Sequence, residues 1–326
     1  MLINICIIRA RTLTKELGVP TPESSRGAHS TGHPLTASAV GVDVGGTGIK
    51  AVLVSDDGAI LAEQSSPTPK PDPTGAHTAD AIAALVRKLT KGERTPVGVT
   101  SPGLADERNG VVLDSVNLGW HRVPIRRLVE ERLGTPVGFS HDVRAGGLAE
   151  MHALGEVEPD CVAAFIPVGT GLAAAIFVGN RPVVGNGWAG EIGQLVFPGG
   201  PHAGKRLEEV ASASILAARM GTDGAAEVAR LVAAGDARAA ELWDEVAAAL
   251  GFALAVVTAT IAPAVIIVGG GLAESGELLF APTRRHLAGY LPGLPLPTLR
   301  PATHGRLAGA LGAALVGRAR MEAIDA

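Results

Sequence analysis

Two apolar runs joined by a short glycine-rich segment occur twice in this chain, and this pattern narrows the folds that the chain can adopt. The first pair covers 41–44 and 50–54, and the second covers 162–168 and 172–178. Because so few residues separate the runs, each pair is predicted to form a β-hairpin. The echo between the pairs is short, but it suggests two related α/β units that face one cleft.

Helical stretches alternate with further buried strands. Apolar residues in 78–89 recur at the spacing of one helical face, and the alanine- and leucine-rich segment 307–321 also predicts a helix. Buried strands are expected at 97–99 and 137–139. Polar residues follow both strands, at the sheet edge where α/β proteins place their ligands. The alternation predicts an α/β protein.

Chain length and composition permit two domains. With 326 residues, 47% of them hydrophobic, the chain can fill two cores. Residues 1–37 contain prolines and serines without a sustained period, and they are predicted to be a disordered leader. We expect a small N-terminal α/β domain at 38–152, completed by a C-terminal helix at 305–326, and a large α/β domain at 153–304.

Charge and hydropathy exclude two classes of partner. The net charge is −4 and no block of lysine and arginine occurs, so no nucleic-acid partner is expected. The segment 247–273 has no charged residue and is long enough to span a membrane, yet Pro263 and three glycines interrupt it. It predicts a buried helix that ends near Ile261 and a buried strand at 265–268, with no membrane partner.

Cysteine usage and the first apolar run bear on the compartment. The chain contains only Cys6 and Cys161, which support neither a disulfide framework nor a thiolate metal site. The apolar run 2–8 is short and no small-residue cleavage site follows it, so it is a poor signal peptide. A cytoplasmic location is predicted.

Glycine-rich segments after strands are candidates for phosphate binding, because glycine lets the backbone approach an anion and its amides can donate to it. A simple tight turn gives the same pattern, so each segment alone has two interpretations. An aspartate beside such a segment could also hold Mg²⁺ through water. The candidate nucleotide-binding residues are Asp43, Gly45, Gly46, Thr47, Lys50, Gly169, Thr170, Gly171, Gly269, Gly270 and Gly271.

The order of these segments resembles the ROK family of bacterial sugar kinases, repressors and uncharacterised open reading frames. Asp43-Val44-Gly45-Gly46-Thr47-Gly48-Ile49-Lys50 is similar to the family's first phosphate motif. Further landmarks follow in family order, and the similarity runs from about Val40 to Ala314: Ser101-Pro102-Gly103-Leu104, Asn117-Leu118-Gly119-Trp120, His141-Asp142, Gly169-Thr170-Gly171, Gly190-Glu191-Ile192-Gly193 and Leu207-Glu208. The resemblance implies two ribonuclease H-like domains, of the actin and hexokinase type, that flank an active-site cleft.

The resemblance also implies an ATP-dependent kinase that phosphorylates a hexose hydroxyl, with ATP and Mg²⁺ as cofactors. A sugar hydroxyl is a poor nucleophile, so its attack needs a carboxylate that accepts its proton. Asp142 matches the family's catalytic base, although an aspartate after a strand is, by itself, more often a helix N-cap. The implied sugar-binding residues are His141, Glu191, Glu208, Asn117 and Gly103.

The sequence departs from the family around the sugar. Most members carry a zinc motif, Cys-x-Cys-Gly-x-x-Gly-Cys, after the Gly-Glu-Ile-Gly segment, and a histidine completes its ligands. Here Gln194 stands at the histidine position and 198–206 contains His202 but no cysteine, so no structural zinc and no other metal site is predicted. His141 replaces a sugar-binding asparagine, as its substitute in recognition or as a packing residue.

These departures leave the identity of the sugar open. The 6-hydroxyl of glucose is one candidate acceptor. An amino-deoxyglucose such as kanosamine is another, because its ammonium would favour Glu191, Glu208 and a neutral His141. Glu209 offers a competing register for Glu208. The alternative function is a catalytically inactive, sugar-sensing protein of the same family, and a homodimer is expected from the resemblance alone.

Overall fold

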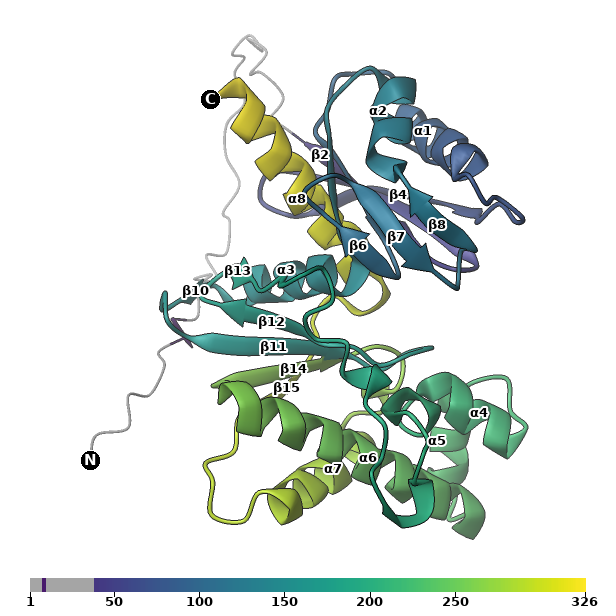
Figure 1. The fold of residues 1–326 in the computed structure, drawn as a ribbon, viewed down its shortest axis with the longest axis vertical. Helices are drawn as coiled ribbons and strands as arrows, with labels where there is room; N and C mark the ends of the chain where they lie inside the picture. Colours follow the sequence, from purple (N-terminus) through teal and green to yellow (C-terminus); the bar gives the residue numbers. More distant parts are fainter. Residues whose placement is uncertain (1–7, 10–37) are drawn as a thin grey trace, which may run out of the picture.

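Two five-stranded sheets with the same strand order form the framework of the computed structural model, which describes residues 8–9 and 38–326 (Figure 1). The first sheet has the order β4 (Ile60–Pro67), β3 (Gly48–Val54), β2 (Ala39–Val44), β5 (Val97–Ser101) and β9 (Val137–His141). The second has the order β13 (Arg181–Pro182), β12 (Ala175–Val178), β11 (Val162–Pro167), β14 (Val265–Gly269) and β15 (Thr298–Pro301). In each sheet three strands pair antiparallel and two more join in parallel. Both predicted hairpins are confirmed, and the similarity between them reflects one topology that occurs twice.

The second hairpin is shorter than predicted. Strand β12 begins at Ala175 rather than at residue 172. The preceding Ala174 N–H donates to Gly190 O at 2.8 Å instead of extending the ladder to β11. The backbone between the turn and β12 therefore supports residues 190–193, which come from a different loop.

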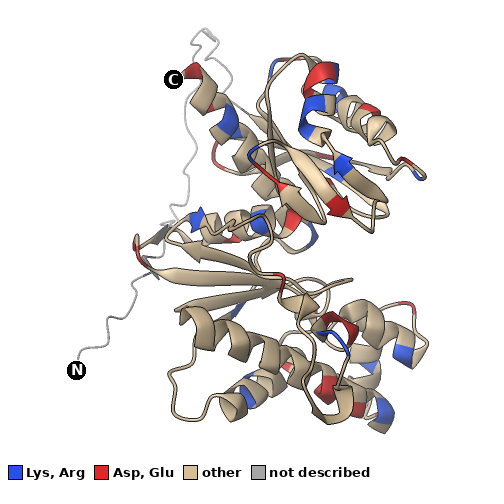
Figure 2. Cartoon of the chain, viewed as in Figure 1, with Lys and Arg blue, Asp and Glu red and all other residues tan. Residues whose placement is uncertain are grey.

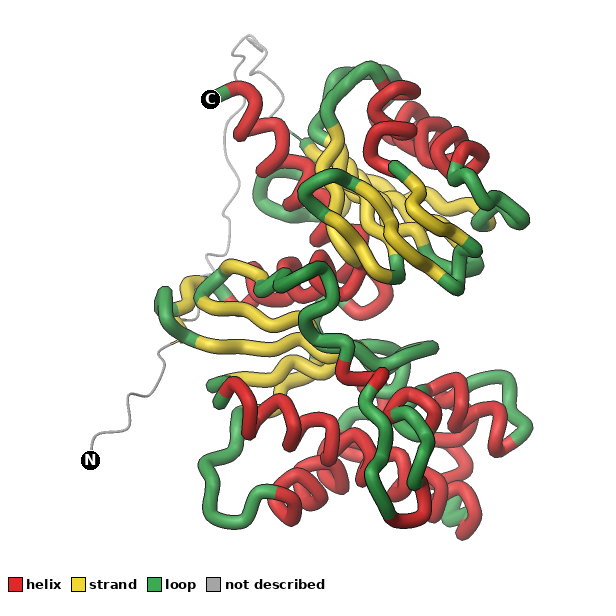
Figure 3. Tube along the Cα trace, in the orientation of Figure 1, coloured by secondary structure: helices red, strands yellow, loops and turns green. Residues whose placement is uncertain are grey.

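Helices and sheets alternate in layers (Figures 1 and 3). The outer face of the first sheet packs against α1 (Ala76–Thr90) and α2 (Ile125–Leu133). On the outer face of the second sheet, a hydrophobic core is formed with four helices: α4 (Ala213–Met220), α5 (Ala225–Ala233), α6 (Ala237–Ile261) and α7 (Glu277–Tyr290). Between the sheets lie α3 (Asp142–Leu154) and α8 (Ala308–Asp325). The helices predicted at 78–89 and 307–321 are confirmed as α1 and α8.

Charge is distributed according to these layers. Figure 2 shows acidic and basic residues intermixed along the outer helices, while β11, β12 and β14 carry no charged residue. Helices cover both faces of these strands, and strands buried on both faces have continuous apolar sequences. Two charged side chains of α3, Arg144 and Glu150, are buried between the sheets, and each has hydrogen-bond partners described below.

Helix α8 rests directly on a row of glycines in the first sheet. Gly41 pairs with Gly98, and Gly98 pairs with Gly138, so the three lie side by side on adjacent strands. A Cβ atom at Gly98 would lie 1.8 Å from Ala313 O, and one at Gly41 would lie 1.8 Å from Ala310 O. Any larger side chain in this row would push the helix off the sheet.

A three-stranded sheet that the sequence analysis did not predict extends the first unit. It consists of β6 (Leu104–Asp106), β7 (Val111–Ser115) and β8 (Trp120–Val123) in antiparallel order. The indole of Trp120 is buried and donates to Asp72 O at 2.8 Å, which fixes this sheet to the segment before α1. The strands are too short for a periodic signal.

Helix α6 is the one helix among the described residues that is long and apolar enough to cross a membrane. It packs instead in the second core, through Leu250, Leu254 and Val257. Its end at Ile261, followed by β14, confirms the predicted buried helix and strand.

The remaining elements are short. In the leader predicted at 1–37, only β1 (Ile8–Arg9) is described, and it pairs antiparallel with β10 (Glu156–Val157); the rest of that prediction lies outside the described residues. The prediction that the cysteines form no disulfide is wrong, because Cys161 is disulfide-bonded. The 3-10 helices are η1 (Ile192–Gln194), η2 (Gly200–His202), η3 (Leu207–Glu209), η4 (Ala273–Ser275) and η5 (Gly305–Leu307).

Candidate active site

The carboxylate of Asp142 lies where the first sheet meets the helices between the sheets. Strand β9 ends at His141, and α3 begins at Asp142. Asp142 Oδ1 accepts a hydrogen bond from Val143 N–H at 2.8 Å, yet 31% of the side chain remains exposed. Among the described residues, the imidazole of His141 is the only basic side chain within ion-pair distance of this carboxylate. Asp142 thus contacts the first turn of α3 and is still free to accept a proton.

The imidazole of His141 links Asp142 to a carboxylate from the second unit. Its Nε2 lies 3.2 Å from Asp142 Oδ1 and 3.9 Å from Glu191 Oε1. Its Nδ1 is buried and has no hydrogen-bond partner among the described residues. The imidazole thus lies between a carboxylate of the first unit and one of the second.

Glu191 reaches this point because two glycines press its segment onto the backbone beyond β11. Gly190 has φ +92°, and a Cβ there would lie 1.8 Å from Ala174 O. A Cβ at Gly193 would lie 2.1 Å from Leu172 O. Burial raises the pKa of Glu191; the His141 imidazole opposes this increase, and the negative charge of Asp142 adds to it.

A third carboxylate, Asp43, approaches from the end of β2. Thr100 Oγ1 donates to Asp43 Oδ1 at 2.9 Å across the parallel pair β2 and β5. Burial raises the pKa of Asp43 to about 6, and the negative charge of Asp142 adds to this increase. The Thr100 hydrogen bond and the positive charge of Lys50 act in the opposite direction. Two carboxylates that repel each other form a site that a cation would stabilise.

Glu208 faces the second glycine turn from η3. Its Oε1 lies 3.0 Å from both Gln194 Nε2 and Arg206 Nη1. A Cβ at Gly171 would lie 3.2 Å from Glu208 Oε2. The neighbouring Glu209 accepts from Arg206 N–H at 2.7 Å and closes a capping box on η3. Of the two neighbouring glutamates, Glu208 and not Glu209 thus lies beside the glycine turn.

The glycine turns are held by backbone hydrogen bonds. Gly45 N–H donates to Gly48 O at 2.9 Å, and Gly169 N–H donates to Gly171 O at 3.1 Å. Gly270 has φ +77° and would place a Cβ 2.4 Å from Val168 O, so the third glycine segment lies directly beside the second turn.

The other predicted residues lie around the first turn. A Cβ at Gly46 would contact the Asn117 side chain at 3.3 Å, so the structure brings the first glycine turn and the Asn117 segment together. Gly103 has φ +103° and packs on the backbone of β7. Lys50 pairs with Asp43 across the hairpin, and its Nζ lies 3.4 Å from Arg306 O.

The sequence analysis missed a buried ion pair beside Asp142. Arg144, in the first turn of α3, is 1% exposed, and its Nε donates to Glu107 Oε1 at 2.8 Å. The same oxygen accepts from Ser140 Oγ at 2.8 Å and from His141 N–H at 2.7 Å. One signal in the sequence could have found it, since Arg144 is the one basic residue on the otherwise small and apolar first turns of α3.

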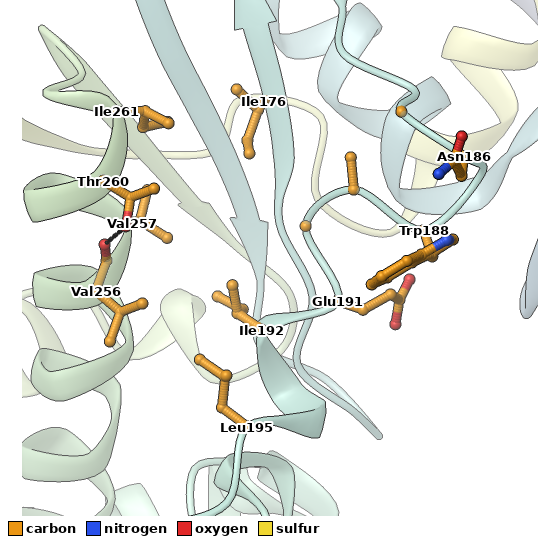
Figure 4. A pocket seen from close by; sticks show the side chains of 13 residues that line it. Ile176, Asn186, Trp188, Glu191, Ile192, Leu195, Val256, Val257, Thr260 and Ile261 are labelled. Atoms are coloured by element: carbon orange, nitrogen blue, oxygen red, sulfur yellow. Dashed lines mark hydrogen bonds between the residues drawn. The ribbon is translucent and has the colours of Figure 1, made fainter.

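An aliphatic cavity of about 410 Å³ lies behind Glu191 (Figure 4). Ile192 and Leu195 face α6 across it, where Val256 and Val257 form the opposite wall. The Glu191 carboxylate points away from these walls, beside Trp188 (Figure 4). The polar cluster and the aliphatic cavity are thus on opposite sides of one loop. The described residues contain no group of three or more His, Cys, Asp or Glu side chains that could hold a metal ion.

Two α/β units with one strand order, and carboxylates that converge from both, define a protein of the actin and hexokinase type. The chain belongs to the ROK family, whose sequence profile matches residues 39–320. It is 34% identical to a glucokinase of Halalkalibacterium halodurans over 198 residues, which cover 57% of this chain and 59% of that relative. The alignment thus spans about three fifths of the relative's length.

Solved structures match over more of the chain. A ROK family glucokinase from Streptomyces griseus, in complex with glucose and AMPPNP, superposes with a TM-score of 0.75 at 29% identity, covering 87% of this chain and 100% of that one. A ROK hexokinase from Thermus thermophilus superposes with a TM-score of 0.71 at 33% identity, covering 89% and 100%. The predicted fold class is confirmed by these structures.

Proposed function

We propose that this protein is an ATP-dependent sugar kinase that transfers the γ-phosphoryl group of ATP to a hexose hydroxyl. The observation that carries the proposal is the convergence of Asp142, His141 and Glu191 from the two units, with an accessible carboxylate at the start of α3. In the proposed step the sugar oxygen attacks the γ-phosphorus in line. Its proton moves to the Asp142 carboxylate, and the bond to the bridging oxygen breaks to release ADP.

The three glycine segments are proposed to receive the nucleotide. Backbone amides at 45–47 and 169–171 would donate to phosphate oxygens, with the hydroxyls of Thr47 and Thr170, and 269–271 would line the adenosine side. Asp43 fits a ligand for Mg²⁺, directly or through water, because its carboxylate repels that of Asp142. When bound, Mg²⁺ would neutralise phosphate charge during transfer.

The sugar is proposed to bind at the polar cluster through His141, Glu191, Glu208, Asn117 and Gly103. Glu208 already accepts from Gln194 and contacts Arg206, whereas in the described part of the chain His141 is the only basic side chain within ion-pair distance of Glu191. Glu191 is therefore the freer acceptor for sugar hydroxyls. The acceptor is the 6-hydroxyl of glucose or of an amino-deoxyglucose such as kanosamine, whose ammonium would be attracted by the neighbouring carboxylates.

Closure of two domains would complete the site. We assign 38–152 with 305–326 to the small domain and 153–304 to the large one, with α3 and α8 as the elements between them. A cytoplasmic homodimer remains part of the proposal, and size-exclusion chromatography with light scattering measures its oligomeric state.

The proposal is tested by ADP release from Mg·ATP in the presence of glucose, mannose, N-acetylglucosamine, glucosamine and 3-amino-3-deoxyglucose. Asp142→Asn keeps the shape of the side chain and is the blank. We expect turnover of at least one sugar, a fall in kcat of about 10²–10⁴-fold in the variant, and sugar binding that is largely kept.

Near-normal turnover by Asp142→Asn would remove Asp142 from the role of base. Sugar binding without turnover of any sugar would instead favour the alternative, a sugar-sensing protein without catalysis. Turnover of glucose, together with no turnover of any amino-deoxyglucose, would exclude the amino sugar.

A further inference from the structure

One buried guanidinium, that of Arg144, contacts the segments that lead to Asp142 and to Glu191. Arg144 lies two residues after Asp142 and is 1% exposed, a burial that arginine reaches only when it is paired. Its Nε donates to Glu107 Oε1 at 2.8 Å, and its Nη2 donates to Gly187 O at 3.2 Å. The guanidinium therefore has one partner in the first unit and one in the second.

On the first side, Glu107 holds the backbone that leads into Asp142. Its Oε1 accepts from Ser140 Oγ and from His141 N–H, at 2.8 and 2.7 Å, in addition to Arg144. Both groups belong to the last two residues of β9, so a shift of Glu107 would move the residue next to the proposed base. Hydrogen bonds to an ionised acceptor are among the stronger ones.

On the second side, Gly187 leads to Glu191 along a tightly packed segment. It has φ +94°, and a Cβ there would lie 2.6 Å from Ala105 O, so this loop touches β6 directly. Four residues later Glu191 N–H donates to Trp188 O. The position of Gly187 O, fixed by Arg144, therefore helps to set where the Glu191 side chain begins.

We propose that Arg144, through its ion pair with Glu107, is a positioning residue that holds Asp142 and Glu191 at the separation needed for phosphoryl transfer. This inference rests on the proposed kinase function. Buried ion pairs contribute little net stability compared with apolar groups of similar size, because desolvation offsets their attraction. A geometric role explains why this one lies next to the reacting groups, where an error of about 1 Å can reduce the rate about 100-fold.

The test replaces both charges, so that no unpaired charge is left buried. Arg144→Met with Glu107→Gln keeps the volume of both side chains but cannot connect β9 to Gly187. We expect kcat to fall about 10- to 100-fold, the usual effect of losing a supporting contact, and the thermal midpoint to change little.

The matched control is Glu150→Gln on the same helix. Glu150 is also 1% exposed, and its carboxylate accepts from Thr303 N–H and His304 N–H, away from Asp142. We expect this variant to lower the thermal midpoint and to leave kcat within about twofold of the wild type. An equal loss of kcat in both variants would reduce Arg144 to a structural residue and overturn the proposal.

A second variant covers the case in which the double replacement does not fold. Arg144→Ala leaves a space shaped like a guanidinium beside Glu107, so millimolar guanidinium ion should restore at least tenfold of the lost kcat. It should restore nothing in Arg144→Ala with Glu107→Gln. No recovery in Arg144→Ala contradicts the proposal.

Amide hydrogen exchange separates a failure of this inference from a failure of the kinase assignment. We expect Arg144→Met with Glu107→Gln to accelerate exchange at both the His141 and the Glu191 amides, and Glu150→Gln to accelerate neither. If the wild type turns over no sugar, the kinase assignment fails, and this exchange pattern still decides whether Arg144 positions both segments. Acceleration at only one of the two amides would overturn it.

Discussion

In the first sheet, the backbone of α8 rests on glycines that belong to the strands, whereas in the second sheet the glycines belong to the helix. Gly41 and Gly98 leave room for α8. Around the second sheet, Phe177 projects from β12 toward α3, and a Cβ at Gly147 of α3 would lie 2.6 Å from its ring. One strand order therefore permits two ways of bringing a helix close to a sheet, through small residues on either partner.

The two arrangements have different consequences for the site. Direct contact between α8 and the first sheet brings the start of α8 to Asp43, since a Cβ at Gly309 would lie 2.9 Å from Asp43 Cγ. The start of α3 carries Asp142 itself. The two helices touch, because a Cβ at Gly312 would lie 1.7 Å from Ala145 O. The stacking of α8 on α3 thus sets the distance between the two carboxylates.

The largest effect is expected where a backbone atom blocks the new side chain. Gly98→Ala places a methyl group 1.8 Å from Ala313 O, and helix α8 as a whole must move to remove this clash. We expect a loss of more than about 4 kcal/mol in the free energy of unfolding, measured by urea denaturation.

The control for Gly98→Ala is the same change in open space. Gly289, near the end of α7, has no atom within 4 Å of a Cβ position. Gly289→Ala should raise stability by about 0.5–1 kcal/mol, because alanine is the better helix former. If both substitutions had the same sign, the row of glycines would not be the reason for the close approach of α8.

Much of this framework could be predicted from local patterns. The hairpins around Gly45 and Gly169, and the helices α1 and α8, follow from apolar spacing and glycine-rich turns, which are properties of neighbouring residues. The partner of a glycine inside a strand is not a local property. Gly41 and Ala310 are far apart in the chain, so the sequence shows the glycine but not the helix that requires it.

The candidate site was predictable in its motif residues but not in its supporting contacts. Asp142 follows a strand, Asp43 lies at the end of one, and Glu191 lies between glycines, and such positions carry function in α/β proteins. Glu107 and Arg144 are 37 residues apart, and although Arg144 stands out on the first turns of α3, nothing in the sequence identifies Glu107 as its partner. The strands β6 to β8 were missed for a related reason, because segments of three to five residues with exposed charges resemble turns.

An effect of intermediate size is expected on the pH dependence of stability, because the first sheet buries the carboxylate of Asp43. The pKa of Asp43 is raised from 3.8 to about 6, so the folded state holds this proton more tightly than the unfolded state. Its contribution to stability is present below about pH 4 and is lost as the pH rises through 6, by about 3 kcal/mol. Asp43→Asn should therefore be more stable than the wild type at pH 7.5, by an amount that shrinks toward pH 4, while the proposed kinase activity should fall.

Urea midpoints of both proteins from pH 4 to pH 7.5 measure this difference. Thr100→Val provides a second check, because the Thr100 hydrogen bond lowers the pKa of Asp43 and its loss should move the transition to higher pH. A difference between wild type and Asp43→Asn that does not vary with pH would show that burial does not perturb this carboxylate.

The smallest effect is expected where a side chain, not the backbone, blocks the new group. Gly147→Ala places a methyl group 2.6 Å from the Phe177 ring, which can turn or shift, so we expect a loss of about 1–3 kcal/mol. Phe177→Leu alone leaves a cavity and also destabilises. Together the two changes complement each other, and the double variant should be more stable than the sum of the single effects predicts, by about 1 kcal/mol.

No smaller neighbouring side chain can rescue Gly98→Ala in the same way, because the atom that blocks its methyl group is a helix carbonyl oxygen. A double-mutant cycle by urea denaturation measures this coupling at Gly147, and additive effects there would mean that the second sheet does not depend on helix glycines for its contact with α3.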